Sequence, residues 1–115
     1  MTRSRKTARA AGTRWETEIV AALQRAGWPH AERRRLAGAR DRGDVAGVVG
    51  VVIEAKSTNR LELAAAVDEA TTEAGNAGAP IGLAWLKRKG RSAAEDGYVV
   101  MDGRTAMRLL KEAGY

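Results

Sequence analysis

The stretch that decides the fold is Val51-Val52-Ile53-Glu54-Ala55-Lys56. It begins apolar on both faces, which is typical of a β-strand covered on two sides. Side chains alternate along a strand, so Glu54 and Lys56 project from the same face, about 7 Å apart. Charged side chains are rarely buried without a partner or a task. This pair therefore predicts either a functional site or an ion pair where the strand emerges into water.

A second carboxylate lies ten residues before Glu54, across a glycine-bounded turn. The turn is Gly47-Val48-Val49-Gly50, and strand-like residues on either side of it predict a β-hairpin. Pairing about the centre of the turn sets Asp44 opposite Ile53 or Glu54, with one residue of register left open. Either register brings two carboxylates within a few ångströms of each other.

Like charges at that separation repel, and a bound divalent cation commonly neutralises them. Asp44, Glu54 and the backbone carbonyl of Ala55 therefore predict an oxygen-lined site for Mg²⁺, for which Mn²⁺ would substitute. Such an ion lowers the pKa of a bound water and stabilises the charge that develops on a phosphodiester. Lys56 is a compact cation suited to orienting that water and holding the phosphate.

A third carboxylate is expected from a helix predicted over residues 12–26, whose apolar stripe starts at Trp15. Glu16 lies roughly 60° from the centre of that stripe, whereas Glu18 lies about 100° away on the opposite flank. We therefore expect Glu16 to complete the metal site, and Glu18 remains the alternative.

The rest of the chain predicts an α/β fold. Further strands are expected over 30–36, 80–86 and 98–101, and helices over 61–77 and after Asp102, with Ala106, Leu109 and Leu110 on the inner face of the last one. The order helix, three strands, helix, two strands, helix is buried most economically as a mixed sheet flanked by helices on both faces. Glu62, Glu69 and Glu73 align on one helical face that we expect to be solvated. The alternatives are a dimer contact, or a supporting role for Glu69 or Glu73 near the metal.

The composition of the chain narrows the classes of function that are possible. Lys and Arg total 20 and Asp and Glu total 14 among 115 residues, a net charge of +6 that suits nucleic acid or an anionic membrane surface. No apolar run approaches the roughly 18 residues of a spanning helix, so we expect a cytoplasmic protein without membrane insertion. The absence of Cys and the single residue His30 exclude zinc fingers, thiol nucleophiles and disulfide scaffolds.

Basic side chains are expected to contact DNA, mostly at phosphates. The candidates are Arg3, Arg5, Lys6, Arg14, Arg33, Arg35, Arg40, Arg42, Lys87 and Arg88. Residues 1–11 carry four of the chain's basic residues without apolar periodicity, which predicts a flexible basic arm before a single domain over 12–115. The three tryptophans are expected in the core rather than as platforms for stacked bases.

The ordered set of a helix Glu, a hairpin Asp and a strand Glu-x-Lys resembles the PD-(D/E)xK nuclease superfamily. Within it, the chain is most similar to the small archaeal and phage Holliday junction resolvases, from about Gly12 to the C-terminus. The segments that carry the resemblance are Gly12 to Glu16, Arg42-Gly43-Asp44-Val45-Ala46-Gly47, Val52-Ile53-Glu54-Ala55-Lys56, Asp68-Glu69-Ala70 through Asn76-Ala77-Gly78-Ala79-Pro80, and Leu86-Lys87-Arg88.

This resemblance implies a restriction-endonuclease-like fold, with Asp44 and Glu54 as metal ligands, Lys56 as the catalytic lysine and Glu16 as the helix acid. It implies a homodimer that makes paired symmetric nicks in a four-way junction and leaves a 5′-phosphate and a 3′-hydroxyl. The chain departs from the superfamily in having Gly43 where a proline is usual. It also lacks the serine that archaeal resolvases carry in the loop before the Asp, so the resemblance does not extend to a serine-assisted step.

Three other interpretations stay open. The same chemistry can act on flaps, forks or duplex DNA, and neither the fold nor the metal site separates these substrates. A non-catalytic DNA-binding module would carry its acids for structural reasons. A basic subunit could act only inside a larger complex. The Arg- and Ala-rich composition would suit a phage of a GC-rich host, whose host cytoplasm would then be the site of action.

Overall fold

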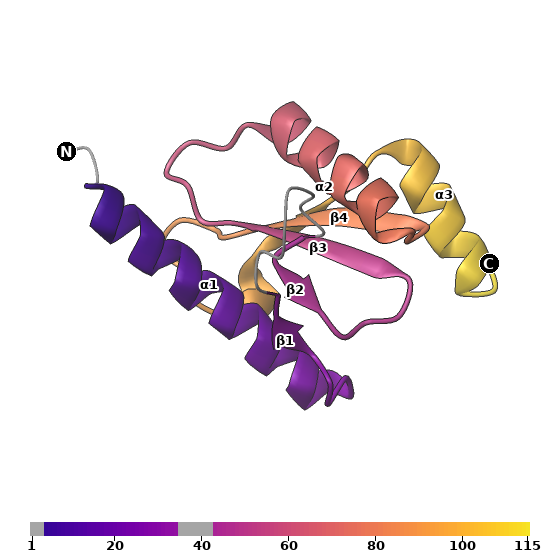
Figure 1. Cartoon of the computed structure of the whole chain (residues 1–115), viewed down its shortest axis with the longest axis horizontal. Helices are drawn as coiled ribbons and strands as arrows, with labels where there is room; N and C mark the ends of the chain where they lie inside the picture. Colours follow the sequence, from indigo (N-terminus) through magenta and orange to yellow (C-terminus); the bar gives the residue numbers. More distant parts are fainter. Residues whose placement is uncertain (1–3, 35–42) are drawn as a thin grey trace.

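The computed structural model of the chain describes residues 4–34 and 43–115, which form a mixed sheet with helices on both sides (Figure 1). The elements in chain order are α1 (Arg5–Ala26), β1 (Glu32–Arg33), β2 (Val45–Ala46), β3 (Val51–Lys56), α2 (Leu63–Ala77), β4 (Ile81–Leu86), the short 3₁₀ helix η1 (Ala94–Asp96), β5 (Tyr98–Val100) and α3 (Gly103–Glu112). This order confirms the expected α/β fold.

The five strands of the described residues lie side by side in sequence order. Three of the four strand pairs are antiparallel, and β3 and β4 are parallel, in register from Val51 with Ile81 to Lys56 with Leu86. Parallel neighbours require a crossover, which α2 provides. Gly82 of β4 lets α2 lie close, because a Cβ at this position would be 2.5 Å from the carbonyl oxygen of Ala70. The parallel pair thus brings the ends of β3 and β4 together.

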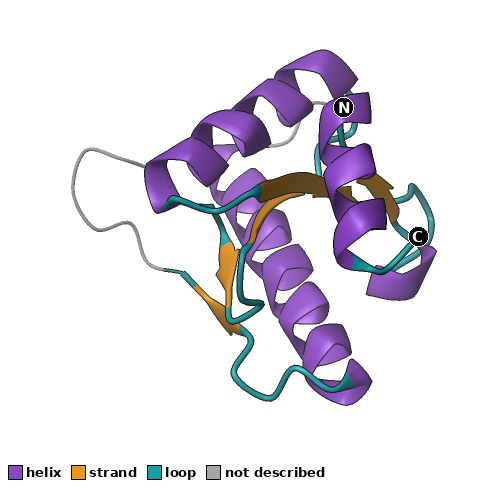
Figure 2. Ribbon diagram, turned by 90° about the vertical axis from the view of Figure 1, so that its right-hand side faces the viewer, coloured by secondary structure: helices purple, strands orange, loops and turns teal. Residues whose placement is uncertain are grey.

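The two faces of the sheet are covered by different helices (Figure 2). On one face, Trp15 and Ile19 of α1 pack against Val45 and Ile53 in the main core cluster. On the other face, the alanine-rich side of α2 contacts β3 and β4. Since side chains alternate along β3, Glu54 and Lys56 lie on the face that α2 covers.

One indole group links α1 to the sheet, and a second links β4 to η1. Trp15 Nε1 donates to the carbonyl oxygen of Trp85 at 2.9 Å, and Trp85 Nε1 donates to that of Ala94 at 3.0 Å. Trp28 is 43% exposed, so the expectation of a core position is wrong for this residue. It follows Gly27, whose left-handed backbone at φ 114° ends α1 and turns the chain outward.

The predicted start of α1 is also wrong. The helix begins at Arg5 rather than at Gly12, because Ser4 caps it by accepting a hydrogen bond from Thr7 N at 3.1 Å. Residues 5–11 are therefore helical instead of forming the expected arm, and they are largely exposed. Arg3 lies outside the described residues.

Smaller differences concern the ends of other elements. Of the strand expected over 30–36, the described residues 30–34 show a strand at Glu32–Arg33, and residues 35–42, with most of the expected loop, lie outside the described residues. Asp102 caps α3 as expected, with Oδ1 accepting from Thr105 N at 2.8 Å. Leu109 and Leu110 are 38% and 52% exposed, which corrects their assignment to an inner face.

In the described part of the chain, no helix has the length and apolarity needed to cross a bilayer.

Candidate active site

The β2–β3 hairpin fixes the position of Asp44. Val45 pairs with Ile53, so Asp44 falls opposite Glu54, which settles the register that the sequence left open. The Asp44 amide donates to the Ile53 carbonyl at 2.9 Å, and its carboxylate Oδ2 accepts from the Ala55 amide at 2.8 Å. The carboxylate is therefore held against the backbone of β3.

Gly43 explains one departure from the superfamily pattern. Its φ is +97°, which proline with its fixed negative φ cannot adopt. A Cβ at Gly43 would also lie 2.6 Å from Val52 Cγ1 and 3.2 Å from the Ile53 carbonyl oxygen. Glycine at this position therefore lets the chain run close to β3 just before Asp44.

Glu54 is the most unusual group of the site. It is 5% exposed, and its Oε2 has no hydrogen-bond partner within residues 4–34 and 43–115. Burial first, then a hydrogen bond with Glu73 and the negative charge of Asp44, raise the pKa of Glu54 to about 10. A buried carboxyl in this state gains a partner when a cation binds beside it.

Lys56 lies between two carboxylates. Its Nζ is 3.3 Å from Glu54 Oε1 and 2.6 Å from Glu69 Oε2. Burial by itself would lower the pKa of Lys56, but the hydrogen bond and charge of Glu69 and the charge of Glu54 outweigh it and raise the pKa. The side chain therefore stays an ammonium, held at the end of β3.

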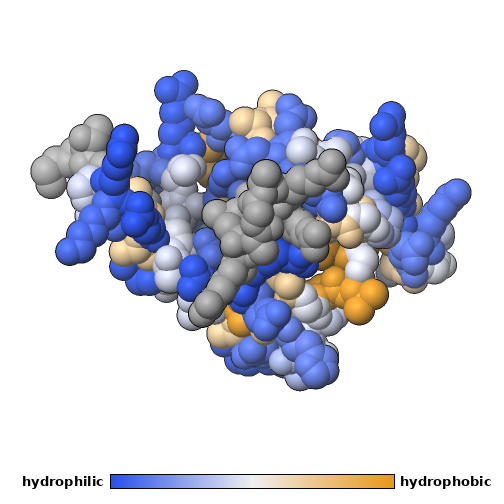
Figure 3. All heavy atoms as spheres, viewed as in Figure 1, coloured by the Kyte–Doolittle hydropathy of each residue, from blue (hydrophilic) through white to orange (hydrophobic). Residues whose placement is uncertain are grey.

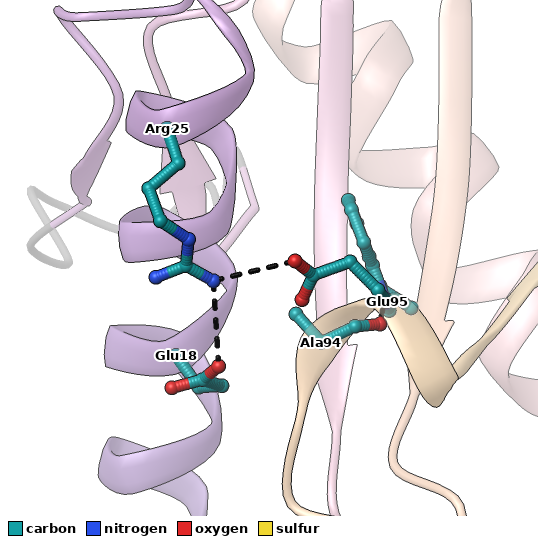
Figure 4. Close-up of polar contacts among 5 residues, drawn as sticks. Glu18, Arg25, Ala94 and Glu95 are labelled. Carbon is teal, nitrogen blue, oxygen red and sulfur yellow. Dashed lines mark hydrogen bonds and ion pairs between the residues drawn. The ribbon is translucent and has the colours of Figure 1, made fainter.

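Glu16, rather than Glu18, faces the hairpin. Burial and then the charge of Asp44 raise the pKa of Glu16, and Arg33, with Nε 3.2 Å from Glu16 Oε1, offsets part of this rise. Glu18 instead lies 3.8 Å from Arg25, which also contacts Glu95 of η1 at 3.4 Å (Figure 4). The charge of Asp44 thus acts on both Glu16 and Glu54.

Two acids of α2, for which a place near the metal was only the alternative expectation, lie beside Glu54. Carboxylate oxygens of Glu54, Glu69 and Glu73 lie within 4.8 Å of one another. Glu73 is 5% exposed, so its expected place on a solvated face is wrong. The signal in the sequence was its position between the small residues Ala70 and Ala74, which let α2 lie close enough to β3 to cover Glu73.

The chemistry of these groups fits a hard divalent cation, because every candidate ligand is an oxygen and Glu54 has a buried oxygen without a partner. Glu54 belongs to two sets: the expected one with Asp44 and Glu16, and the observed cluster with Glu69 and Glu73. Lys56 contacts Glu54, and Asp44 lies opposite Glu54 in the hairpin, whereas the carboxylate cluster found among the described residues includes neither Asp44 nor Glu16. The catalytic and metal-binding roles of Glu16, Asp44, Glu54 and Lys56 stay predictions.

The expected DNA-contacting residues are spread over several surfaces, and hydrophilic side chains dominate the face in Figure 3. Arg5 and Lys6 are exposed near the start of α1. Arg14 and Lys87 line one hollow of about 550 Å³, and Lys87 and Arg88 line another of about 420 Å³. Arg33 is engaged with Glu16. Arg3, Arg35, Arg40 and Arg42 lie outside the described residues.

Comparison with known proteins supports the fold. Neither a protein-family model nor a curated protein matches the sequence. Among solved structures, the chain is similar to Hjc of Archaeoglobus fulgidus, a Holliday junction resolvase from an archaeal hyperthermophile. The similarity has a TM-score of 0.53 and 22% sequence identity, and it covers 84% of this chain and 93% of that chain. The chain therefore shares the restriction-endonuclease-like fold of that archaeal protein.

Proposed function

We propose that this chain is a divalent-metal-dependent endonuclease that hydrolyses phosphodiester bonds of branched DNA, with four-way junctions as its main substrate. The observation that carries the proposal is the hairpin geometry: Asp44 is hydrogen-bonded to the Ala55 amide, directly beside buried Glu54 and on the strand that carries Lys56. The shared fold with a protein described as a Holliday junction resolvase favours the branched substrate.

The roles follow from the positions of the side chains. Bound Mg²⁺ or Mn²⁺ would supply Lewis-acid stabilisation of the phosphodiester and a bound water of lowered pKa. Asp44 and Glu54 would hold the ion, together with the carbonyl of Ala55, and Glu16 would complete the site from α1. Lys56 would hold the reacting phosphate by its charge, while Glu69 keeps its ammonium at the end of β3.

The assembly follows from the substrate. A four-way junction needs two symmetric nicks, and one chain carries one such site, so a two-fold symmetric homodimer would deliver both cuts. Each cut would leave a 5′-phosphate and a 3′-hydroxyl. On this proposal the protein acts on DNA in the cytoplasm, which would be that of the host if a phage encodes it.

Cleavage of a labelled immobile four-way junction tests the proposal. Wild type and Asp44→Asn are compared with Mg²⁺, with Mn²⁺ and with EDTA, beside duplex, fork and flap DNA. Asp68→Asn, at an exposed position of α2, is the matched control. We expect paired nicks on the junction that EDTA and Asp44→Asn abolish and that Asp68→Asn retains.

Other outcomes would identify the alternatives. Equal cutting of every branched DNA would retain the nuclease and remove the preference for junctions. Tight DNA binding without metal-dependent cutting would contradict the proposal and indicate a DNA-binding module. A monomer on gel filtration that stays inactive with junction DNA would indicate a subunit of a larger complex.

A further inference from the structure

A second binding surface adjoins Lys56. A hollow of about 420 Å³ lies between the loop after β3 and the loop after β4, within the range of about 300–1,000 Å³ typical of ligand sites. Its polar walls are residues 57–59 on one side and residues 87–89 on the other, and Tyr98 of β5 closes it. We call this hollow the basic groove.

The basic groove continues from the candidate active site. Lys56 pairs with Leu86 and Leu86 pairs with Tyr98, so the three residues form one row across β3, β4 and β5. With strands about 4.8 Å apart, the Cα atoms of Lys56 and Tyr98 are roughly 10 Å apart. A neighbouring hollow of about 350 Å³, lined by Lys56, shares Thr58 and Leu61 with the groove. An extended ligand at Lys56 can therefore run into the groove.

The charge of the basic groove favours a polyanion. Lys87, Arg88 and Lys89 contribute three cations, and the described residues that line the groove include no carboxylate. The neighbouring hollow, by contrast, carries the two carboxylates Glu62 and Glu69 beside the cations Lys56 and Arg60. The Lys56 amine, which contacts Glu54 and Glu69, therefore lies between the carboxylate cluster of Glu54, Glu69 and Glu73 and a basic groove suited to phosphates.

Tyr98 gives the basic groove a flat aromatic surface. Its side chain is 45% exposed although it lies on a strand of the sheet. An exposed ring beside phosphate-binding cations is the combination with which proteins hold single strands, because every base can stack on it. Bases inside a duplex are already stacked on their neighbours, whereas a branch point offers bases that can leave the stack at low cost.

We propose that the basic groove binds the DNA strand next to the cleaved bond, with residues 87–89 on its phosphates and Tyr98 stacked on a base freed at the branch. The inference rests on the proposed nuclease function and adds to it a source of preference for branched over duplex DNA. The cations strengthen binding to any DNA, and Tyr98 discriminates in favour of the branch.

Binding in EDTA, where no cleavage is expected, tests the role of Tyr98. Wild type, Tyr98→Leu and Tyr98→Phe are compared on the junction and on duplex arms of the same sequence. Tyr115→Leu, which changes a 91% exposed tyrosine beyond α3, is the matched control. We expect Tyr98→Leu to weaken junction binding roughly 5- to 100-fold and to leave duplex binding unchanged. Tyr98→Phe and Tyr115→Leu should keep wild-type affinity.

Photo-crosslinking of the unaltered protein supplies a second measurement that does not depend on the folding of a variant. Junctions carrying 5-iodouracil at single positions around the branch are irradiated with the protein, and the attached residue is identified by mass spectrometry. We expect a crosslink to Tyr98 from a branch-point position and none from the matching duplex.

The outcomes separate this inference from the proposed function. Metal-dependent junction cleavage with unchanged junction affinity in Tyr98→Leu, or crosslinks only outside the groove, would overturn the inference and leave the nuclease standing. A loss of affinity that is equal for junction and duplex would also overturn it. A Tyr98 crosslink without any cleavage would overturn the nuclease and retain the groove as a site for branched DNA.

Discussion

At Glu54, a buried carboxyl has three ionisable neighbours: Asp44, Glu73 and the amine of Lys56, which is 3.3 Å away. The arrangement costs stability whenever Glu54 is ionised, because one cation faces several acids in a poorly solvated place. The same excess of acids favours the binding of a divalent cation. Stability of the free protein and affinity for metal are thus opposed at this residue.

Glu54→Gln separates the two effects. The raised pKa means that the native state holds a proton that the unfolded state releases above the ordinary Glu pKa, so stability in EDTA falls as pH rises from there to about 10. The amide removes this dependence, and we expect Tm in EDTA at pH 8 to rise by on the order of 5 °C. Calorimetry should also find that Mg²⁺ no longer raises Tm. A lower Tm in EDTA would contradict this account, and Glu112→Gln on α3 serves as the control.

Glu69 positions Lys56 rather than touching the substrate. Its Oε2 lies 2.6 Å from Lys56 Nζ, and Glu69→Gln removes the charge while keeping the shape. We expect kcat for junction cleavage to fall about 10- to 100-fold with KM nearly constant, the size typical of groups that orient a catalytic residue. Glu69→Asp should recover part of the rate. A change confined to KM would show that Glu69 acts on DNA binding instead.

The sequence located some site residues and not others, for physical reasons. Alternation along β3 was enough to place Glu54 and Lys56 on one face. The register of Asp44 depended on two hydrogen bonds to the backbone of β3, which no spacing rule encodes. The burial of Glu73 depended on how closely α2 approaches the sheet, and Gly82 on another element controls that distance.

At the scale of elements, the longest ones were easiest to predict. The helical periodicity of α1 and α2 and the apolar runs of β3 and β4 extend over many residues, so they were recognised. The start of α1 depended on the single cap at Ser4. Strands were expected where β1 and β2 lie, but with two residues each they are too short for a pattern to fix their ends. Such short strands form because a neighbouring strand is there to pair with: β2 pairs with β3, and β1 pairs with β2.

The cap of α3 gives a prediction at this scale. The hydrogen bonds from Thr105 hold the pKa of Asp102 below its ordinary value, so their stabilising effect is present above that value and is lost as pH falls through the lowered one. Asp102→Ala should lower Tm at pH 7 by about 3–8 °C. Asp102→Asn should retain most of the cap and lose its pH dependence. Thermal melts between pH 2 and 7 would contradict the idea if all three proteins shared one profile.

At the scale of the whole molecule, the net charge of +6 and the exposed basic side chains predict binding dominated by phosphates. Composition alone was enough for this expectation, because it depends on totals rather than on geometry. The separation of a basic groove without carboxylates from a neighbouring hollow of mixed charge could not be predicted in the same way. It arises only when the loops after β3 and β4 are brought together.

A salt titration of DNA binding measures this property. We expect the logarithm of affinity to fall linearly with the logarithm of salt concentration, by roughly 0.9 per phosphate contacted. Arg14→Gln should reduce the slope by about 1 for junction and duplex alike. Lys111→Gln on α3 is the control, since it lies away from the hollows that Arg14, Lys87 and Arg88 line. An unchanged slope in Arg14→Gln would remove this residue from the DNA contact surface.

The pair of indole hydrogen bonds that links Trp15, Trp85 and Ala94 has an optical consequence. Trp15 is 2% exposed, whereas Trp28 is 43% exposed. Acrylamide should therefore quench the fluorescence of Trp28 in the native protein and reach Trp15 only after unfolding. In a Trp28→Phe variant the remaining emission would come from the contact between α1 and β4. The fluorescence of this variant would then report, without any added label, the detachment of α1, the helix that carries Glu16, from the sheet.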